Sequence, residues 1–266
     1  MGLSVADVAA ASAAWVWEPE NAEVVGTDGY RMVRLPEYYD FDLSVVSFTP
    51  NGPLGAAVDA VVQRAREFRV PVLDWQVLIG HPAGLAEELV ARGGRVKLEL
   101  EVLAADLGKG APRLREPEVE VELRWATDAA SSRDGAEVAV TGFGGELPPR
   151  ERIEAAALRN ARTVAAGEGG TLVAYVNGEP AGTSGVELVG GVARLTGGVV
   201  APAWQRKGVY RALLAARLGY AAEHGARMAL VKANPATSGP ILRRAGFTGY
   251  GQEPVYAVPL APPAGE

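Results

Sequence analysis

A short basic segment, Gln205–Tyr210 (Gln-Arg-Lys-Gly-Val-Tyr), has the residue types of an anion-binding loop. It leads into a predicted helix, Val209–His224, and the first N–H groups of a helix, together with its dipole, favour an anion. Gly208 lets the backbone approach a ligand oxygen, while Arg206 and Lys207 place charge where a diphosphate would lie. A polar strand-to-helix connection has the same composition, so the flanking elements must decide between the two interpretations.

The elements predicted around this segment form a mixed sheet flanked by helices. Asn177-Gly178 marks a hairpin and Asp128 a helix N-cap. The predicted strands are Val119–Trp125, Thr171–Val176, Pro180–Leu188, Ala193–Ala201, Arg227–Ala233 and one near Val255–Val258. The predicted helices are one that follows Asp128, then Arg150–Ala165, Val209–His224 and Gly239–Ala245. The pattern predicts an α/β fold, with an α+β mixed sheet.

The N-terminal half of the chain repeats this order of elements. Its predicted elements are strand Leu43–Thr49, helix Ala56–Phe68, strand Leu73–Ile79, helix Leu85–Ala91 and strand Val96–Leu103. Pro82 and Gly93 precede Pro235 and Gly246 by 153 residues each. We therefore expect two domains of one fold, residues 1–110 and 118–260. The predicted linker between them is Gly108–Pro117, a segment rich in Gly, Pro and charge.

Three motifs of the C-terminal half stand in a characteristic order. Gln205–Val209 fits a Q/R-x-x-G-x-G/A pattern between a strand and a helix, with Tyr210 in place of the final small residue. Asn234 follows the next strand, and Gly246-Phe247 follows a short helix. With these motifs the chain resembles the Gcn5-related N-acetyltransferase (GNAT) family over roughly Val119–Leu260. The resemblance implies two GNAT-like domains in tandem, each a central mixed β-sheet flanked by helices.

The resemblance also implies a binding site for acetyl-coenzyme A as acyl donor, without a metal. The pantetheine arm is expected to contact Gly198, Val199 and Val200. The pyrophosphate is expected to contact Gln205, Arg206, Lys207, Gly208, Val209 and Tyr210. The pantetheine or the thiol end is expected to contact Asn234 and Ser238. Gly197-Gly198 suits a β-bulge that would open a slot beside the strand. Tyr210 must point away from the diphosphate or cover it. Asn234 also fits a turn before Pro235.

The residues for catalysis are a separate prediction. In the GNAT family a tyrosine on the last short helix often protonates the thiolate, and Leu242 stands at that position here. Tyr250 and Tyr256 are alternative acids, although each also fits as a packing residue. Glu187 is the candidate base for the amine because it is adjacent to the expected slot. A solvated strand carboxylate is the other interpretation of Glu187, and Glu146 is a second candidate base.

The N-terminal half keeps the pattern of elements but loses the phosphate chemistry. Its corresponding loop, Asn51–Gly55, has no cation, and Pro53 removes an N–H donor. His81 stands where the other half has Asn234. We interpret this half as a degenerate copy and expect one coenzyme A per chain.

Composition excludes several other classes of function. The net charge of −6 disfavours nucleic-acid binding, which needs clustered cations. The chain has no cysteine and only two histidines, so Cys-ligated and three-His metal sites are excluded. No G-x-S-x-G motif indicates a hydrolase. The apolar stretch that begins at Val8 follows Asp7 and lacks a basic region, and no run reaches about 18 apolar residues. We expect a cytoplasmic protein without membrane contact.

These observations predict an acetyl-CoA-dependent N-acetyltransferase that acts on the amine of a small molecule. Two alternatives stay open: a non-catalytic acyl-CoA-binding module, indicated by Leu242, and an acetyltransferase that acts on a protein amine. The sequence identifies neither the acceptor nor the oligomeric state.

Overall fold

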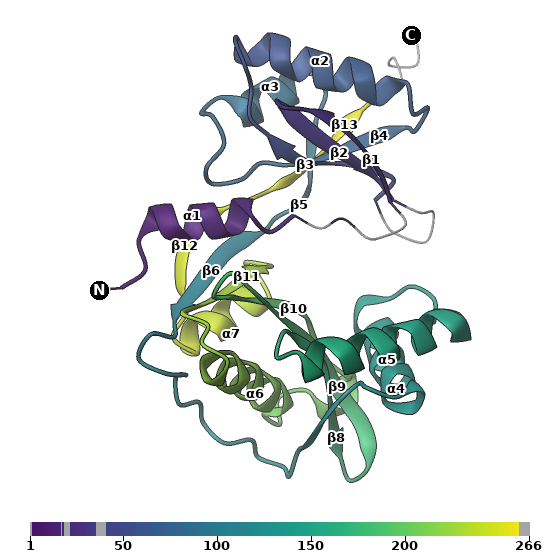
Figure 1. Ribbon diagram of the computed structural model, residues 1–266, viewed down its shortest axis with the longest axis vertical. Helices are drawn as coiled ribbons and strands as arrows, with labels where there is room; N and C mark the ends of the chain where they lie inside the picture. Colours follow the sequence, from purple (N-terminus) through teal and green to yellow (C-terminus); the bar gives the residue numbers. More distant parts are fainter. Residues whose placement is uncertain (1, 17, 19–21, 36–40, 261–266) are drawn as a thin grey trace. The chain divides into compact units, whose positions relative to one another are not determined.

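The computed structural model describes residues 2–16, 18, 22–35 and 41–260 (Figure 1). Its contacts divide the chain into two compact units. The C-terminal unit consists mainly of Ala104–Val231 and Leu242–Thr248. The N-terminal unit consists mainly of Ser4–Leu103, Lys232–Ile241 and the described residues from Gly249 on. Each unit is described by itself.

The C-terminal unit is built on a seven-stranded sheet with the order β12-β6-β11-β10-β9-β8-β7 among the described residues. The strands are β6 (Glu101–Asp106), β7 (Glu122–Trp125), β8 (Gly169–Val176), β9 (Glu179–Val189), β10 (Val192–Val200), β11 (Met228–Ala233) and β12 (Thr248–Gln252). The helices are α4 (Ala129–Phe143), α5 (Arg150–Ala165), η1 (Pro202–Trp204), α6 (Val209–Glu223) and α7 (Ser238–Arg244). These bounds confirm the predicted hairpin and the predicted helices to within a few residues.

Helices cover both faces of this sheet, with α6 on one face and α4 and α5 on the other (Figure 1). The Asp128 side chain accepts a hydrogen bond from Ser131 N and caps α4 as predicted. On the other face, Val209 and Leu213 of α6 pack on Leu172 and Val200. This core fixes the start of α6 against β8 and β10.

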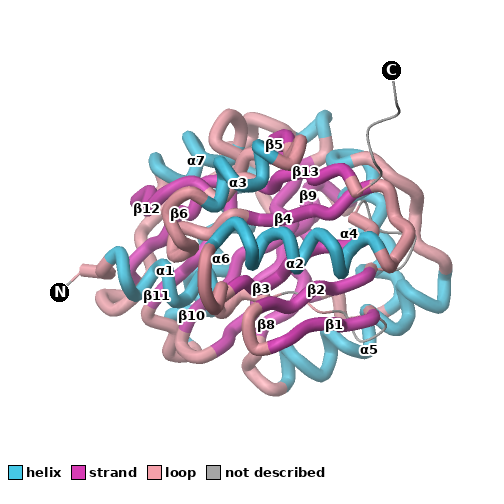
Figure 2. Tube along the Cα trace, turned by 90° about the horizontal axis from the view of Figure 1, so that it is seen from above, coloured by secondary structure: helices cyan, strands magenta, loops and turns pink. Residues whose placement is uncertain are grey.

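The N-terminal unit is built on a six-stranded sheet with the order β1-β2-β3-β4-β13-β5 among the described residues. The strands are β1 (Glu23–Thr27), β2 (Tyr30–Arg34), β3 (Leu43–Phe48), β4 (Val72–Gln76), β5 (Arg95–Leu98) and β13 (Val255–Pro259). The helices are α1 (Val5–Ala13), α2 (Leu54–Arg66) and α3 (Leu85–Ala91). Figure 2 shows α2 across the face of β2, β3 and β4, where Val58 and Val62 pack on the buried Trp75. The hairpin β1-β2 and helix α1 were not predicted.

The strands near the ends of the two halves do not pair as the repeat predicts. The expected single strand Val96–Leu103 is two strands, β5 and β6, and β6 pairs in the C-terminal sheet. The last strand, β13, pairs between β4 and β5 of the N-terminal sheet. β6 is buried at consecutive positions and β13 at most positions, so neither pattern specifies the partner sheet. The predicted domains, 1–110 and 118–260, stay a prediction, and the compact units divide the chain differently.

Candidate acyl-donor site

The segment before α6 has the geometry of an anion-binding loop. Gly208 is the N-cap of α6 with φ of 90°, and Arg206 also has a left-handed backbone, with φ of 63°. A left-handed arginine is a strained conformation of the kind that gathers at functional sites. The first N–H groups of α6 have no partner within the helix, as at every helix start. These N–H groups are therefore available to an anion at the positive end of the helix dipole.

Two side-chain contacts hold this loop in place. The Gln205 amide donates a hydrogen bond of 3.2 Å to the carbonyl of Val200 and ties the loop to the end of β10. The Lys207 ammonium lies 4.4 Å from the centre of the Trp204 ring, a cation–π contact that keeps its charge beside the loop. The Arg206 side chain is exposed. These two contacts tie the loop to the end of β10 and to Trp204.

The predicted linker packs directly on the loop. Glu118 N donates to the carbonyl of Lys207 at 2.9 Å, and Arg211 of α6 donates to the carbonyl of Arg115 at 3.3 Å. A Cβ on Gly208 would lie 2.6 Å from Cα of Pro117, which no real contact allows. Gly208 is therefore required both for its backbone angle and for the close approach of the linker. Sequence reasoning found this glycine but not the linker contact.

Tyr210, the departure from the family pattern, is directed at β10. A Cβ on Gly198 would lie 3.0 Å from Cε2 of Tyr210 and 3.6 Å from Nη2 of Arg217. The large tyrosine thus fits because the residue opposite has no side chain. Its ring packs with Val209 and Leu213 on the α6 face of the sheet. The Tyr210 ring therefore points toward the strand instead of away from the domain.

The predicted bulge in β10 is confirmed. The pairing of β10 with β9 shifts register between Thr196 and Val199, so that Gly197 and Gly198 have no partner residue in β9. The parallel pairing of β10 with β11 ends at Arg194. Beyond this point the backbone of β10 is not paired with β11, as expected for a strand that opens a slot. The contact of Gly198, Val199 and Val200 with a pantetheine arm stays a prediction.

Asn234 and Ser238 form a local turn. The Asn234 Oδ1 accepts hydrogen bonds from Ala236 N at 2.9 Å and Thr237 N at 3.2 Å. The Ser238 hydroxyl accepts from Asn234 N at 3.1 Å. These bonds agree with the interpretation of Asn234 as a turn residue. Both residues belong to the N-terminal unit, whereas the anion-binding loop belongs to the C-terminal unit. Their contact with an acyl donor stays a prediction.

The candidates for acid and base occupy different environments. Leu242 is fully buried, and Tyr256 lies in the core of the N-terminal unit, where it packs as a hydrophobic residue. Glu187 is exposed near the end of β9, opposite Arg194, to which it forms an ion pair of 3.4 Å. Glu146 is exposed in the loop after α4. The role of Glu187 as the base stays a prediction.

The corresponding helix of the N-terminal unit begins beside a carboxylate. The loop ends at Pro53, the N-cap of α2, which has no side-chain cap. A Cβ on Gly55 would lie 3.2 Å from Oε2 of Glu88. Arg92 bridges the two segments, because it donates to Glu88 Oε2 at 2.6 Å and to the carbonyl of Gly55 at 2.9 Å. The carboxylate of Glu88 thus lies near the start of α2, whereas the start of α6 in the other unit carries an exposed loop.

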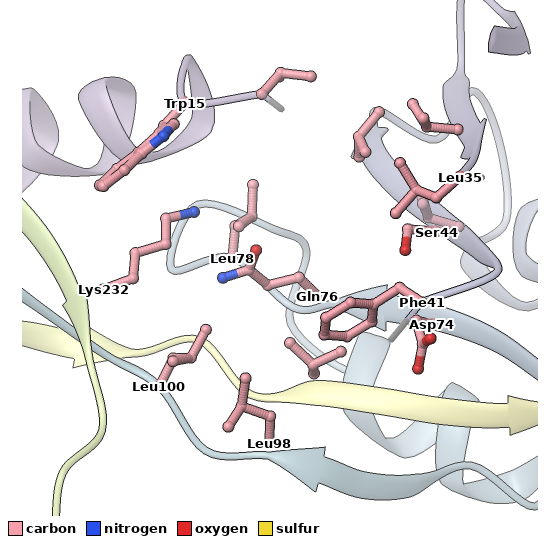
Figure 3. A pocket seen from close by; sticks show the side chains of 15 residues that line it. Trp15, Leu35, Phe41, Ser44, Asp74, Gln76, Leu78, Leu98, Leu100 and Lys232 are labelled. Carbon is pink, nitrogen blue, oxygen red and sulfur yellow. The ribbon is translucent and has the colours of Figure 1, made fainter. Parts of the chain in front are cut away.

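The N-terminal unit also contains a cavity of ≈ 230 Å³ that sequence reasoning missed. Figure 3 shows the aromatic rings of Trp15 and Phe41 and the polar groups of Ser44, Gln76 and Lys232 around it. The signal that could have found it is Val72–Gln76, a strand that carries Asp74 and Gln76 on one face. None of the site residues predicted from the sequence lines this cavity.

A buried carboxylate organises one wall of the cavity. Glu253 is fully buried and forms an ion pair of 3.0 Å with Lys232. It also accepts hydrogen bonds from the Ser12 hydroxyl at 2.8 Å, the Gln76 amide at 3.2 Å and Ile79 N at 3.2 Å. The network fixes two groups that line the cavity, Gln76 and Lys232. The ion pair and the hydrogen bonds compensate the negative charge of Glu253 in the interior of the unit.

Within the described part of the chain, no group of three or more His, Asp and Glu side chains could hold a metal ion. No helix of the described residues has the length and apolar character needed to cross a membrane.

Comparison with known proteins agrees with this geometry. Residues 137–247 match the model of the acetyltransferase (GNAT) family. The fold is similar to that of a GCN5-related N-acetyltransferase from Kribbella flavida (17% identity, TM-score 0.69, covering 100% of this chain and 97% of the other). It is also similar to a GCN5-related N-acetyltransferase from Sphaerobacter thermophilus (19% identity, TM-score 0.68, covering 88% and 78%).

A third similar structure is a tandem GNAT protein from the clavulanic acid biosynthesis pathway (18% identity, TM-score 0.63, covering 96% of this chain and 88% of the other). At such identities the likeness establishes the fold, with two GNAT-like domains in tandem. The comparison with curated proteins finds no match for this chain.

Proposed function

We propose that this chain, in which residues 137–247 form a GNAT acetyltransferase domain, transfers an acetyl group from acetyl-coenzyme A to the amine of a small molecule. The observation that carries the proposal is the pair of backbone features on either side of η1. The first N–H groups of α6 have no partner within the helix, and Gly197 and Gly198 of the β10 bulge have no partner residue in β9. Together they suit a ligand with a diphosphate and an extended amide arm.

The loop supplies the binding energy for the charged part of the donor. The N–H groups of 206–210 face the pyrophosphate, and Arg206 and Lys207 add charge-assisted hydrogen bonds. The backbone of Gly198–Val200 pairs with the pantetheine arm as an added strand would. These residues hold the thioester beside the bulge. Asn234 and Ser238 are the proposed contacts nearer the thiol.

The transfer needs one bond exchange and the loss of one proton from the amine. The amine nitrogen forms a bond with the thioester carbonyl carbon, the C–S bond breaks, and coenzyme A leaves as the thiolate. The attacking amine releases its proton to a base or to water. Glu187 is our candidate for that base, acting from the face of the sheet where it pairs with Arg194. A backbone N–H of the β10 bulge stabilises the charge on the carbonyl oxygen.

The main competing function is binding of acyl-coenzyme A without catalysis. It is favoured by the burial of Leu242, a residue that has no proton to donate. Transfer to a protein amine is a further alternative that differs only in the acceptor.

A thiol-release assay distinguishes these functions. The protein is incubated with acetyl-CoA and a panel of small amines, and in parallel with lysine-containing peptides, while free thiol is measured. Release with at least one small amine above the rate without acceptor is the expected result. Binding of coenzyme A without release on any acceptor supports the binding module. Release with peptides alone assigns a protein acceptor, and failure to bind coenzyme A overturns the proposal.

A further inference from the structure

Arg217 of α6 is a charged side chain in the interior of the C-terminal unit. It is 2% exposed, and Nη1 donates hydrogen bonds to the carbonyl of Gly185 at 3.2 Å and the carbonyl of Thr196 at 3.5 Å. Its Nε donates to the carbonyl of Leu213. Nη2 makes no hydrogen bond of ordinary length and angle within the described chain, although the Tyr210 hydroxyl lies nearby. No carboxylate of the described residues forms an ion pair with Arg217, so its charge is not neutralised locally.

The guanidinium lies beneath the bulge of β10. Thr196 is the last residue of β10 before the register shift, and its carbonyl accepts one of the Arg217 hydrogen bonds. Nη2 would be 3.6 Å from a Cβ on Gly198, in the bulge itself. Arg217 therefore links β9 to β10 at the position where β10 leaves its neighbours.

The groups that face Arg217 come from three elements. Tyr210 lies beside it on α6, and both approach Gly198 of β10. Ser184 of β9 lies opposite Leu172 of β8 in the sheet, and Leu172 packs on α6. Because paired residues point to the same face, the buried hydroxyl of Ser184 also points toward α6. That hydroxyl also has no partner within the described chain. The ion pair of Glu187 and Arg194 lies on the opposite face by strand alternation.

An unpaired buried charge destabilises a fold, so its presence calls for a role beyond packing. Burial lowers the pKa of Arg217, and the neighbouring Tyr210 raises it. A guanidinium nevertheless keeps its charge in proteins. In a dry environment such a charge acts on its neighbours far more strongly than it would in water.

We propose that Arg217 is a positioning residue of the acyl-transfer site, which holds the bulge by its carbonyls and lowers the pKa of the coenzyme A thiol bound beside it. This inference rests on the proposed function, because the proposed contacts of the pantetheine arm place the thiol end near Gly198. The C–S bond of the thioester breaks with both electrons on sulfur. A buried positive charge favours the thiolate, and so no side chain has to donate a proton to it.

The thiol of bound coenzyme A reports this effect without any acceptor. Thiolate absorbs in the ultraviolet, so a pH titration of the protein–coenzyme A complex, minus the protein alone, gives the pKa of the bound thiol. Free coenzyme A in the same buffer gives the reference value. We expect the pKa of the bound thiol to be lower than that of the free thiol by about one unit or more.

Three variants refine the measurement. Arg217→Met removes the charge at similar volume, and the bound thiol should then lose its shift. Arg217→Lys keeps a charge and should restore part of the shift. Arg133→Met removes an exposed charge of α4, paired with Glu137, and should leave the shift unchanged. Binding affinity for coenzyme A is measured for each variant, since a merely structural role would change affinity and thermal stability but not the thiol pKa.

The possible outcomes separate the two proposals. If coenzyme A does not bind to the wild-type protein, the proposed function fails first. If it binds and its thiol titrates as in free coenzyme A, the role of Arg217 is wrong while the binding function stands. That comparison needs only wild-type protein, so it decides the matter even if Arg217→Met does not fold. An equal shift in wild type and Arg217→Met would also contradict the role.

Discussion

Glu88 lies against Gly55 at the start of α2, with its Oε2 3.2 Å from the position where a Cβ of residue 55 would stand. Gly55 corresponds in the repeat to Gly208, the residue before α6. Gly55 is the second residue of α2, whereas Gly208 is the N-cap of α6. One start carries an internal carboxylate and the other a loop with Arg206 and Lys207. Glu88, held by its ion pair with Arg92, occupies the position that an anion would take at this helix start. The two halves therefore have different capacities for a diphosphate.

The first prediction concerns stoichiometry. Because Glu88 stands at the start of α2, coenzyme A should bind once per chain, at the loop before α6. Isothermal titration calorimetry with coenzyme A should give one site. The variant Glu88→Gln should leave this site unchanged in affinity, since Glu88 belongs to the other unit. Two equivalent sites per chain would show that the N-terminal half still binds the ligand.

The second prediction concerns two glycines of one helix region. Gly208→Ala should destabilise the protein by about 1–3 kcal/mol, since it combines a left-handed backbone with a clash on Pro117. Gly219→Ala is the matched control within α6, where an added Cβ meets no atom within 4 Å. It should stabilise the protein by about 0.5–1 kcal/mol. Urea unfolding measures both, and equal effects of the two changes would refute the packing of Pro117 on Gly208.

The third prediction concerns acid stability. Burial, with a smaller contribution from Lys232, lowers the pKa of His81 from 6.5 to about 4, although Glu253 opposes this. Its Nδ1 accepts a hydrogen bond from Leu78 N at 3.1 Å, which requires the neutral ring. The unfolded chain takes up a proton at higher pH than the folded chain does. The stability that His81 contributes is therefore complete above pH 6.5 and is lost as the pH falls toward about 4.

The variant His81→Gln tests this direction of the pH dependence of stability. Its free energy of unfolding should fall less than that of the wild type when the pH is lowered from about 7 to about 5. His224→Gln, the other histidine variant, should follow the wild type. A parallel loss in His81→Gln and wild type would contradict the shifted pKa.

The fourth prediction concerns the base. If Glu187 accepts the amine proton, Glu187→Gln should lower kcat by about 100-fold, with little change in the KM for acetyl-CoA. Glu179→Gln changes another exposed carboxylate of β9 and should keep wild-type kinetics. An unaltered kcat in Glu187→Gln would assign Glu187 to its ion pair with Arg194 alone.

Local patterns in the sequence were sufficient for much of this fold. The start of α6 after Gly208, the cap at Asp128 and the bulge at Gly197-Gly198 depend on nearby residues, and all three were predicted correctly. The partner sheet of β13 depends on pairing between distant segments, and a mostly buried strand has no periodicity that could assign it.

The sequence predicted site residues only where neighbouring residues of one segment supply the binding groups. The loop before α6 was found because Gly and two cations adjoin a helix start. Arg217 was missed because a single arginine in a helix is normally a solvent-facing residue, and only the packed structure shows its burial. The contact of Glu88 with Gly55 was missed for the same reason, since it joins α3 to α2.

The central claim is that the loop before α6 holds the pyrophosphate of coenzyme A. The most direct measurement is the affinity for coenzyme A, determined by calorimetry for three proteins. They are the wild type, the double variant Arg206→Ala/Lys207→Ala and a matched control. The control, Arg159→Ala/Arg162→Ala, removes two exposed charges of α5. Each lost charged hydrogen bond should weaken binding by about 1.5–3 kcal/mol in the first variant, with no change in the control. Pantetheine, which lacks the diphosphate, should bind the wild type far more weakly and should not distinguish the variants. Equal affinity of all three proteins for coenzyme A would contradict the claim.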